Sequence, residues 1–335
     1  MLLGGATLFA LTACGQSTAQ TLSRAAQPSR QPAPTDVLDY APAAGLRWLA
    51  YARPAQIADN PALASALSGL LPPARLDAYE RATAVDLRKL PAALVAGYDL
   101  GILYVAALPS AAAPQIRERF ASRLTDGGIV KQVRSDIYRI SGTEKDTPLA
   151  LVSVENRMVA LASGDLTLAR VVEAYAARRL KSPTALRGAA LSTLAPPATE
   201  VLVAFYAPGP FSGATLAAAP RLLDSSIGLG LEVSAASATS VTLSATLAGE
   251  WSEPTTEREE LARVWKALAE SQTGRLLGLD TAQNVDLSST REHLRLTLEL
   301  AIAPLISGLR ALTVANAPEI FDLIPSTPNS LPDPN

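Results

Sequence analysis

The sequence contains very little of the chemistry on which metal, disulfide and nucleic-acid binding depend. Its 335 residues include one Cys and one His. A single Cys excludes a disulfide within the chain, and the two counts together exclude sites built from several Cys or His ligands. The 29 Lys and Arg are balanced by 31 Asp and Glu, so the basic surplus that nucleic-acid binding needs is missing. We therefore expect no cofactor, no metal site and no nucleic-acid partner.

Charged and aromatic side chains are also scarce, at 18% and 5% of the residues, whereas 48% are hydrophobic. The hydrophobic residues are unevenly distributed, and the first 13 form a short apolar segment without a charged side chain. This segment is too short to span a bilayer core, which takes about 20 helical residues. An apolar segment that ends in small residues is typical of a secretory signal peptide.

The apolar segment ends in Leu11-Thr12-Ala13-Cys14, which resembles the lipobox of bacterial lipoproteins. In that family signal peptidase II cuts before the Cys, whose thiol carries a diacylglycerol, and the new amine is usually acylated as well. The resemblance implies a signal peptide over residues 1–13 and lipidation of Cys14. Two or three acyl chains anchor a protein stably to a bilayer, whereas one chain binds only marginally. The alternative is an ordinary N-terminal segment in which Cys14 is incidental.

The resemblance also implies a location in the bacterial cell envelope, with the membrane as a partner through the lipid anchor. Gly15, and not Asp, follows Cys14, which in enteric-type sorting leads to the outer membrane, facing the periplasm. We assign residues 14–44 to the acylated Cys and a tether. The stretch from Gly15 to Thr35 is nearly free of large apolar residues, which predicts disorder. The Pro-rich tail, residues 321–335, is predicted to be disordered as well.

The body between tether and tail is predicted to be α+β, with two tandem repeats of a mainly antiparallel sheet and helices packed on it. Residues 45–182 form the first repeat and residues 183–320 the second. Each half has the order strand, helical stretch, hairpin, helix, several strands, helix. A segment around residues 181–197, with three prolines, is the expected joint. This layout behind a lipobox is similar to uncharacterised lipoproteins of GC-rich bacteria, a resemblance that carries a fold expectation and no site.

The longest apolar run of the body, residues 92–108, could be a membrane span or a buried hairpin. It contains Asp99 and two glycines and has Pro91 and Pro109 at its flanks. A charge near the middle of a bilayer costs about 2.5–3.5 kcal/mol on insertion scales. We therefore predict a hairpin around residues 97–101.

No complete catalytic constellation is found in the body. His293 alternates with four Leu in the segment 293–300, which places it with Arg295, Thr297 and Glu299 on the polar face of a strand. No Gly-x-Ser-x-Gly motif and no complete phosphate-binding Gly motif occurs. Three further groups are best explained as solvated helix or turn chemistry: the basic cluster Arg117, Arg119 and Arg123, the carboxylates Glu257, Glu259 and Glu260, and the oxygen ligands Asp280, Asn284 and Asp286.

These observations leave three functional hypotheses. The first is a membrane-anchored envelope lipoprotein that is not an enzyme and has a binding or scaffold role, with an envelope protein as partner. The second is a carrier or sensor of a lipid or another apolar ligand, held between sheet and helices. The third is a hydrolase with an unrecognised carboxylate site. Cys14, as lipidation site, is the one residue to which the sequence assigns a chemical role.

Overall fold

The computed structural model describes residues 33–109, 112–125, 128–188, 190–212 and 219–321. The chain divides into residues Met1–Pro32 and a compact body, Ala33–Asn335. The predicted signal peptide, Cys14, most of the predicted tether and residues 322–335 of the predicted tail lie outside the described residues.

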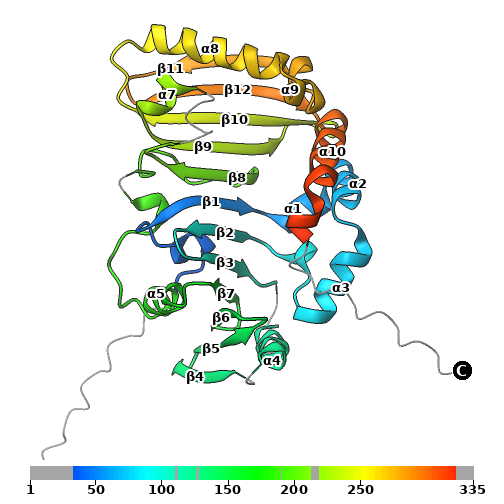
Figure 1. Cartoon of the computed structure of the whole chain (residues 1–335), viewed down its shortest axis with the longest axis vertical. Helices are drawn as coiled ribbons and strands as arrows, with labels where there is room; N and C mark the ends of the chain where they lie inside the picture. The colour runs from blue at the N-terminus through cyan, green and yellow to red at the C-terminus, as the bar shows by residue number, and fades with distance from the viewer. Residues whose placement is uncertain (1–32, 110–111, 126–127, 189, 213–218, 322–335) are drawn as a thin grey trace, which may run out of the picture. The chain divides into compact units, whose positions relative to one another are not determined.

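The body is α+β, as predicted, and the described residues form a sheet of 12 strands (Figure 1). The strands are β1 (Leu46–Ala52), β2 (Ala93–Tyr98), β3 (Ile102–Ala107), β4 (Ile129–Arg134), β5 (Ile137–Glu144), β6 (Thr147–Val154), β7 (Met158–Ser163), β8 (Val201–Pro208), β9 (Ser226–Ala235), β10 (Ser240–Gly249), β11 (Gln283–Ser289) and β12 (His293–Ala301). The α-helices are α1 (Pro54–Asp59), α2 (Pro61–Leu70), α3 (Pro73–Thr83), α4 (Ala113–Arg123), α5 (Thr167–Ala176), α7 (Pro220–Asp224), α8 (Pro254–Glu270), α9 (Gln272–Leu276) and α10 (Ile302–Phe321). The 3-10 turns are η1 (Val37–Tyr40), η2 (Leu87–Lys89), η3 (Ala185–Arg187) and η4 (Leu279–Thr281).

One sheet combines the strands of both predicted repeats. Its order is β11-β12-β10-β9-β8-β1-β2-β3-β7-β6-β5-β4, with antiparallel pairing between the neighbours. The first strand of each half, β1 and β8, pair with each other through residues 49–52 and 203–206. The two halves are therefore continuous in hydrogen bonding, and the sheet has two well-separated edges, β4 and β11.

The two faces of the sheet differ in what covers them. We call the face that carries Leu49, Leu103 and Tyr206 face 1, and the face that carries Trp48, Leu151 and Leu294 face 2. Residues directly opposite in the register share a face because side chains alternate along each strand. On face 1, α5 and the turns η1 and η3 cover strands β1 to β7 and bury a large core that includes Leu49, Leu94, Leu103, Val152 and Val172.

The structured body begins earlier than the composition indicates. Residues 33–44, assigned above to the tether, contribute to the core of face 1: Val37 and Tyr40 are completely buried. Asp36 caps η1 by accepting a hydrogen bond from the backbone N–H of Leu38 (3.0 Å). The predicted joint near residues 181–197 also packs on this face, where Leu191 and Leu194 are buried. A few isolated apolar residues were sufficient for this packing, although their spacing matches neither the period of a helix nor that of a strand.

Face 2 carries two separate cores, one toward each edge of the sheet. Helix α4 packs on β5 and β6 through Ile116 and Phe120, which are buried against Leu149 and Leu151. Helix α8 packs on β11 and β12 through Leu261, which is buried with Leu294 and other Leu residues of β12. Figure 1 shows α8 and α4 at opposite ends of the row of strands, with β8, β1 and β2 between them.

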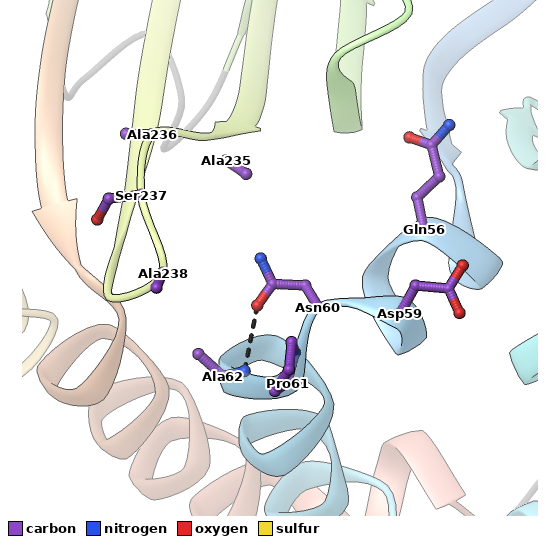
Figure 2. A pocket seen from close by; sticks show the side chains of 9 residues that line it. All are labelled: Gln56, Asp59, Asn60, Pro61, Ala62, Ala235, Ala236, Ser237 and Ala238. Carbon is purple, nitrogen blue, oxygen red and sulfur yellow. Dashed lines mark hydrogen bonds between the residues drawn. The ribbon is translucent and has the colours of Figure 1, made fainter.

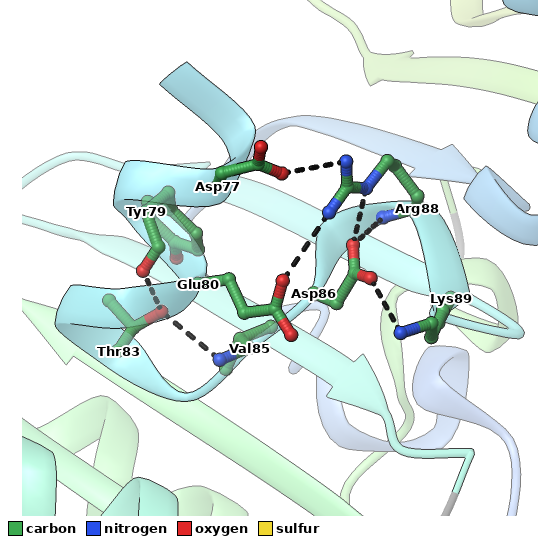
Figure 3. A network of polar contacts seen from close by, with 8 residues as sticks. All are labelled: Asp77, Tyr79, Glu80, Thr83, Val85, Asp86, Arg88 and Lys89. Atoms are coloured by element: carbon green, nitrogen blue, oxygen red, sulfur yellow. Dashed lines mark hydrogen bonds and ion pairs between the residues drawn. The ribbon is translucent and has the colours of Figure 1, made fainter. Parts of the chain in front are cut away.

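An ion-pair network holds the segment that connects α3 to β2 (Figure 3). The Arg88 guanidinium contacts Asp77 (2.9 Å), Glu80 (3.3 Å) and Asp86 (2.8 Å). Lys89 Nζ also lies 3.0 Å from Asp86. Burial raises the pKa of Asp86. Hydrogen bonds from the side chains of Arg88 and Lys89 and from the Arg88 backbone together lower it by more, so that the pKa is about 2. Residues 86–89 are thereby fixed against α3.

Most of the predicted elements are present, including the hairpin β2–β3 within residues 92–108. Among the described residues, no helix is long and apolar enough to cross a membrane. Residues 276–279 have the apolar composition of a strand, but this segment ends α9 and begins η4. Ser271 caps α9 by accepting from the N–H of Gly274 (2.9 Å), and Gly278 ends the helix at φ +72°. This short helix buries few apolar residues, so its periodicity is too brief to distinguish it from a strand.

Candidate functional site

A row of apolar side chains crosses the middle of face 2, between the core beneath α4 and the core beneath α8. Tyr104, Val95, Ala50, Phe205 and Leu231 lie directly opposite one another on β3, β2, β1, β8 and β9. Trp48 and Val203 flank this row on β1 and β8. We call these seven residues the apolar strip. Four strand spacings of about 4.8 Å make it about 19 Å long.

Every residue of the strip is partly exposed, and Val203 is 38% exposed. None of the seven belongs to the described cores on either face. The strip lies between the α4 core and the α8 core. Helix α1 contacts β8, and Tyr79 of α3 interacts with Tyr104, so these two helices border the strip. Burial raises the pKa of Tyr104.

Two aromatic rings of the strip lie close together. The ring centroids of Trp48 and Phe205 are 6.4 Å apart, with an angle of 18° between the planes. The Trp48 indole lies over Gly97 of β2, where a Cβ atom would come within 2.4 Å of it. Gly97 therefore provides the space that lets the indole lie across the neighbouring strand.

An open groove of about 720 Å³ lies at one end of the central strands (Figure 2). Its described lining comes from the α1–α2 junction and from the turn between β9 and β10: Gln56, Asp59, Asn60, Pro61, Ala62, Ala235, Ala236, Ser237 and Ala238. Asn60 caps α2, because its Oδ1 accepts from the backbone N–H groups of Ala62 (3.1 Å) and Leu63 (3.3 Å). Figure 2 shows Asn60 between the helical side and the hairpin side of the groove.

The groove adjoins the apolar strip. Ala235 ends β9 and lies on face 2, two residues beyond Val233, which pairs with Val203 of the strip. On the other side, α1 begins two residues after Ala52, the last residue of β1. Because β1 and β9 run in the same direction, both chain segments leave the sheet at the same end. The groove, which carries polar side chains on a mainly apolar lining, thus continues from the apolar strip.

Face 1 of the C-terminal half is polar, in contrast to the strip. It carries Glu232, Ser244, Arg295, Thr297 and Glu299, which are hydrogen-bonded among themselves and to their neighbours. Arg295 Nε donates to Ser244 Oγ (2.8 Å), and Tyr206 donates to Glu232 Oε1 (2.8 Å). Asn284 Nδ2 donates to Glu299 Oε2 (2.8 Å). These hydrogen bonds pair the polar side chains with one another. Among the described residues of this face, no group of polar side chains points together toward a position where a ligand would bind.

The structure confirms the predicted place of His293 at the start of β12 on the polar face of the strand, beside four buried Leu. Its Nε2 lies 2.9 Å from the carbonyl oxygen of Thr193. The ring is therefore tied to the segment that covers face 1. Cys14, the predicted lipidation site, lies outside the described residues.

The three polar groups considered in the sequence lie on different elements: the Arg cluster on α4, the Glu cluster on α8, and Asp280, Asn284 and Asp286 on η4 and β11. Arg117 lies over the Tyr138 ring at 4.4 Å and donates to Ser153 Oγ (3.0 Å), so it is part of the packing of α4 on the sheet. Arg123 lies 3.8 Å from Glu144.

Of the three carboxylates of α8, only Glu257 lies in the first turn, and Glu260 pairs with Arg263 within the same helix. Asp280 lies in η4, whereas Asn284 and Asp286 lie in β11. Over the described parts of the chain, no group of three or more His, Cys, Asp or Glu is arranged to hold a metal ion.

The apolar strip was not predicted from the sequence, although a signal exists. Both β1 and β8 are apolar at almost every position, on both faces, whereas β12 alternates strictly. A strand that is apolar on both faces predicts cover on both sides. Only the sheet order shows that β1 and β8 lie side by side, beyond the reach of the α4 core and the α8 core.

Comparisons with known proteins give structural similarity only. No protein-family model matches the sequence, and no curated protein matches it. The fold is similar to that in "Structure of crystal form III of TP0453", with 12% sequence identity over 83% of this chain and 99% of that chain and a TM-score of 0.48. "Structure of crystal form I of TP0453" has 12% identity over 84% and 99% of the two chains and a TM-score of 0.44.

Proposed function

We propose that the protein is a non-enzymatic, lipid-anchored component of the bacterial cell envelope that binds the apolar tail of a lipid on face 2 of its sheet. The observation that carries this proposal is the apolar strip, a continuous row of partly exposed side chains over five strands. Contiguous apolar surfaces on a folded protein mark binding sites for partners, membranes or ligands. The strip therefore favours the carrier or sensor role over a scaffold that acts through polar surface.

The dimensions and chemistry of the strip fit a lipid tail. A bilayer core of about 30 Å is made of two leaflets, so one tail extends about 15 Å, less than the length of the strip. The strands beneath the strip are paired on both sides, so they offer no free backbone groups for an added peptide strand. An acyl chain needs no hydrogen bonds and gains about 25 cal/mol for each Å² of apolar area removed from water.

Charge placed on the strip tests this proposal. We expect the full chain with Cys14→Ala, which has no acylation site, to retain near-stoichiometric lipid on purification, measured by extraction and mass analysis. Val203→Glu should abolish most of this retention, because an acyl chain would have to desolvate the carboxylate. Thr246→Glu, on face 1 of β10, is the matched control and should retain lipid. If Val203→Glu folds and keeps its lipid, the strip is not the site.

We also propose that Cys14 carries the lipid anchor and that the body acts near the outer membrane, facing the periplasm. Leu11-Thr12-Ala13-Cys14 supports this proposal through its resemblance to the lipobox. An anchor would hold the strip close to its supply of lipid. Cys14→Ala should abolish acyl labelling and membrane association in cell fractionation, and persistence of both would overturn the anchor.

We further propose that the two halves of the body arose by tandem duplication. In each half the first strand lies at the centre of the sheet, a hairpin follows outward, and later strands return from the edge inward. Helices α4 and α8 follow the two hairpins, β2–β3 and β9–β10, and both lie on face 2. A superposition of β1–α4 on β8–α8 that fails to match these elements in order would contradict duplication.

A further inference from the structure

The groove beside the strip has a mainly apolar lining that also carries polar side chains, and these side chains bear on the kind of lipid bound. Gln56 and Asn60 supply carboxamide groups, and Asp59 is the one charged side chain among the described lining residues. Since the Asn60 oxygen accepts from two backbone N–H groups of α2, its Nδ2 remains as a donor toward the groove. The groove therefore offers hydrogen-bond donors and acceptors together with one negative charge.

The Arg53 side chain is directed away from the groove. Arg53, between β1 and α1, donates from Nε to the Tyr51 hydroxyl (2.8 Å) and from Nη1 to the carbonyl oxygen of Thr199. Tyr51 lies on face 1, so the guanidinium is held on the opposite side of the sheet. In the described part of the chain, no Lys or Arg forms an ion pair with Asp59. A phosphate in the groove would meet the Asp59 carboxylate without a cation to offset it.

We propose that this groove binds the headgroup of the lipid whose tail lies on the strip, and that the headgroup is uncharged and carries hydroxyl groups, as in an acylglycerol. Hydroxyl groups donate to the Asp59 carboxylate and accept from the amide N–H groups of Asn60 and Gln56. This inference rests on the proposed binding of a lipid tail. It adds selection by headgroup, with Asp59 as the residue that disfavours anionic lipids.

Two probes with the same tail and glycerol backbone separate headgroup from tail: 1-oleoylglycerol and 1-oleoylglycerol 3-phosphate. Each displaces a fluorescent fatty acid from the full chain carrying Cys14→Ala, at low ionic strength where charge is least screened. We expect 1-oleoylglycerol to bind about tenfold more tightly than its phosphate. Asp59→Asn should reduce this ratio to about threefold or less by improving binding of the phosphate. Asp224→Asn, an exposed carboxylate in α7, should leave the ratio unchanged.

The outcomes distinguish this inference from the function on which it rests. Equal affinity for the two probes, or tighter binding of the phosphate, would overturn headgroup selection and leave tail binding in place. An unchanged ratio of the two affinities in Asp59→Asn would show that Asp59 does not select the headgroup. If neither probe displaces the fatty acid, both the headgroup site and the tail site are wrong.

Discussion

Asp86 shows how single residues fix a connecting segment of this protein. Its side chain is 9% exposed and accepts from Arg88 and Lys89, which lowers the carboxyl pKa to about 2. A group whose pKa is lowered on folding stabilises the fold at pH values above its unfolded pKa, near 3.9. That stabilisation is lost as the pH falls from about 4 to about 2.

We expect Asp86→Asn to remove part of the acid sensitivity of the fold. At pH 7 the variant should lose about 1–2 kcal/mol of unfolding free energy, because its ionic partners are partly exposed and screened. Near pH 2 the variant and the original chain should be equally stable. Urea denaturation at both pH values measures the difference, and an equal loss at pH 2 and pH 7 would contradict the role of the charge.

At the scale of elements, helix α5 is tied to the sheet by a charged pair within an apolar core. Glu173 of α5, 7% exposed, accepts from Arg139 of β5 at 2.8 Å on face 1. Removing one partner of such a pair leaves the other buried without compensation. We therefore expect Arg139→Met to cost about 3–5 kcal/mol of unfolding free energy in chemical denaturation.

The double variant Arg139→Met/Glu173→Leu is the control for this prediction. It replaces the pair by apolar side chains of similar size and should recover most of the lost stability, because no charge remains buried. If both variants lose the same amount, the cost comes from packing and not from the unpaired carboxylate.

The elements also show what the sequence can and cannot predict. The hairpin β2–β3, the strand β12 and helix α8 follow from apolar periodicity, because each buries one regular set of side chains. Helix α9 cannot be predicted in this way, since its five residues are too few for a periodic signal. The contribution of Val37 and Tyr40 to the core also escapes prediction, because isolated apolar residues in a polar segment carry no period.

At the scale of the whole body, the decisive fact is the pairing of β1 with β8. Two α+β halves were predicted from the order of their elements, but their junction is a long-range contact that no local pattern encodes. This pairing places Trp48 and Phe205 side by side and extends the apolar surface from β3 to β9. The cores beneath α4 and α8 include none of the strip residues. The candidate site is therefore a property of the sheet order and not of any motif.

Quenching of Trp48 fluorescence by lipids with brominated tails tests tail binding on the strip most directly. Bromine quenches an indole only at contact range, and Trp48 belongs to the strip, on its middle strand β1. We expect brominated lipid to quench the full chain carrying Cys14→Ala. Adding Trp48→Phe should remove most of the quenching, whereas adding Trp265→Phe, in the core beneath α8, should preserve it. Equal quenching with and without Trp48, or no quenching at saturating lipid, would contradict a lipid tail on the strip.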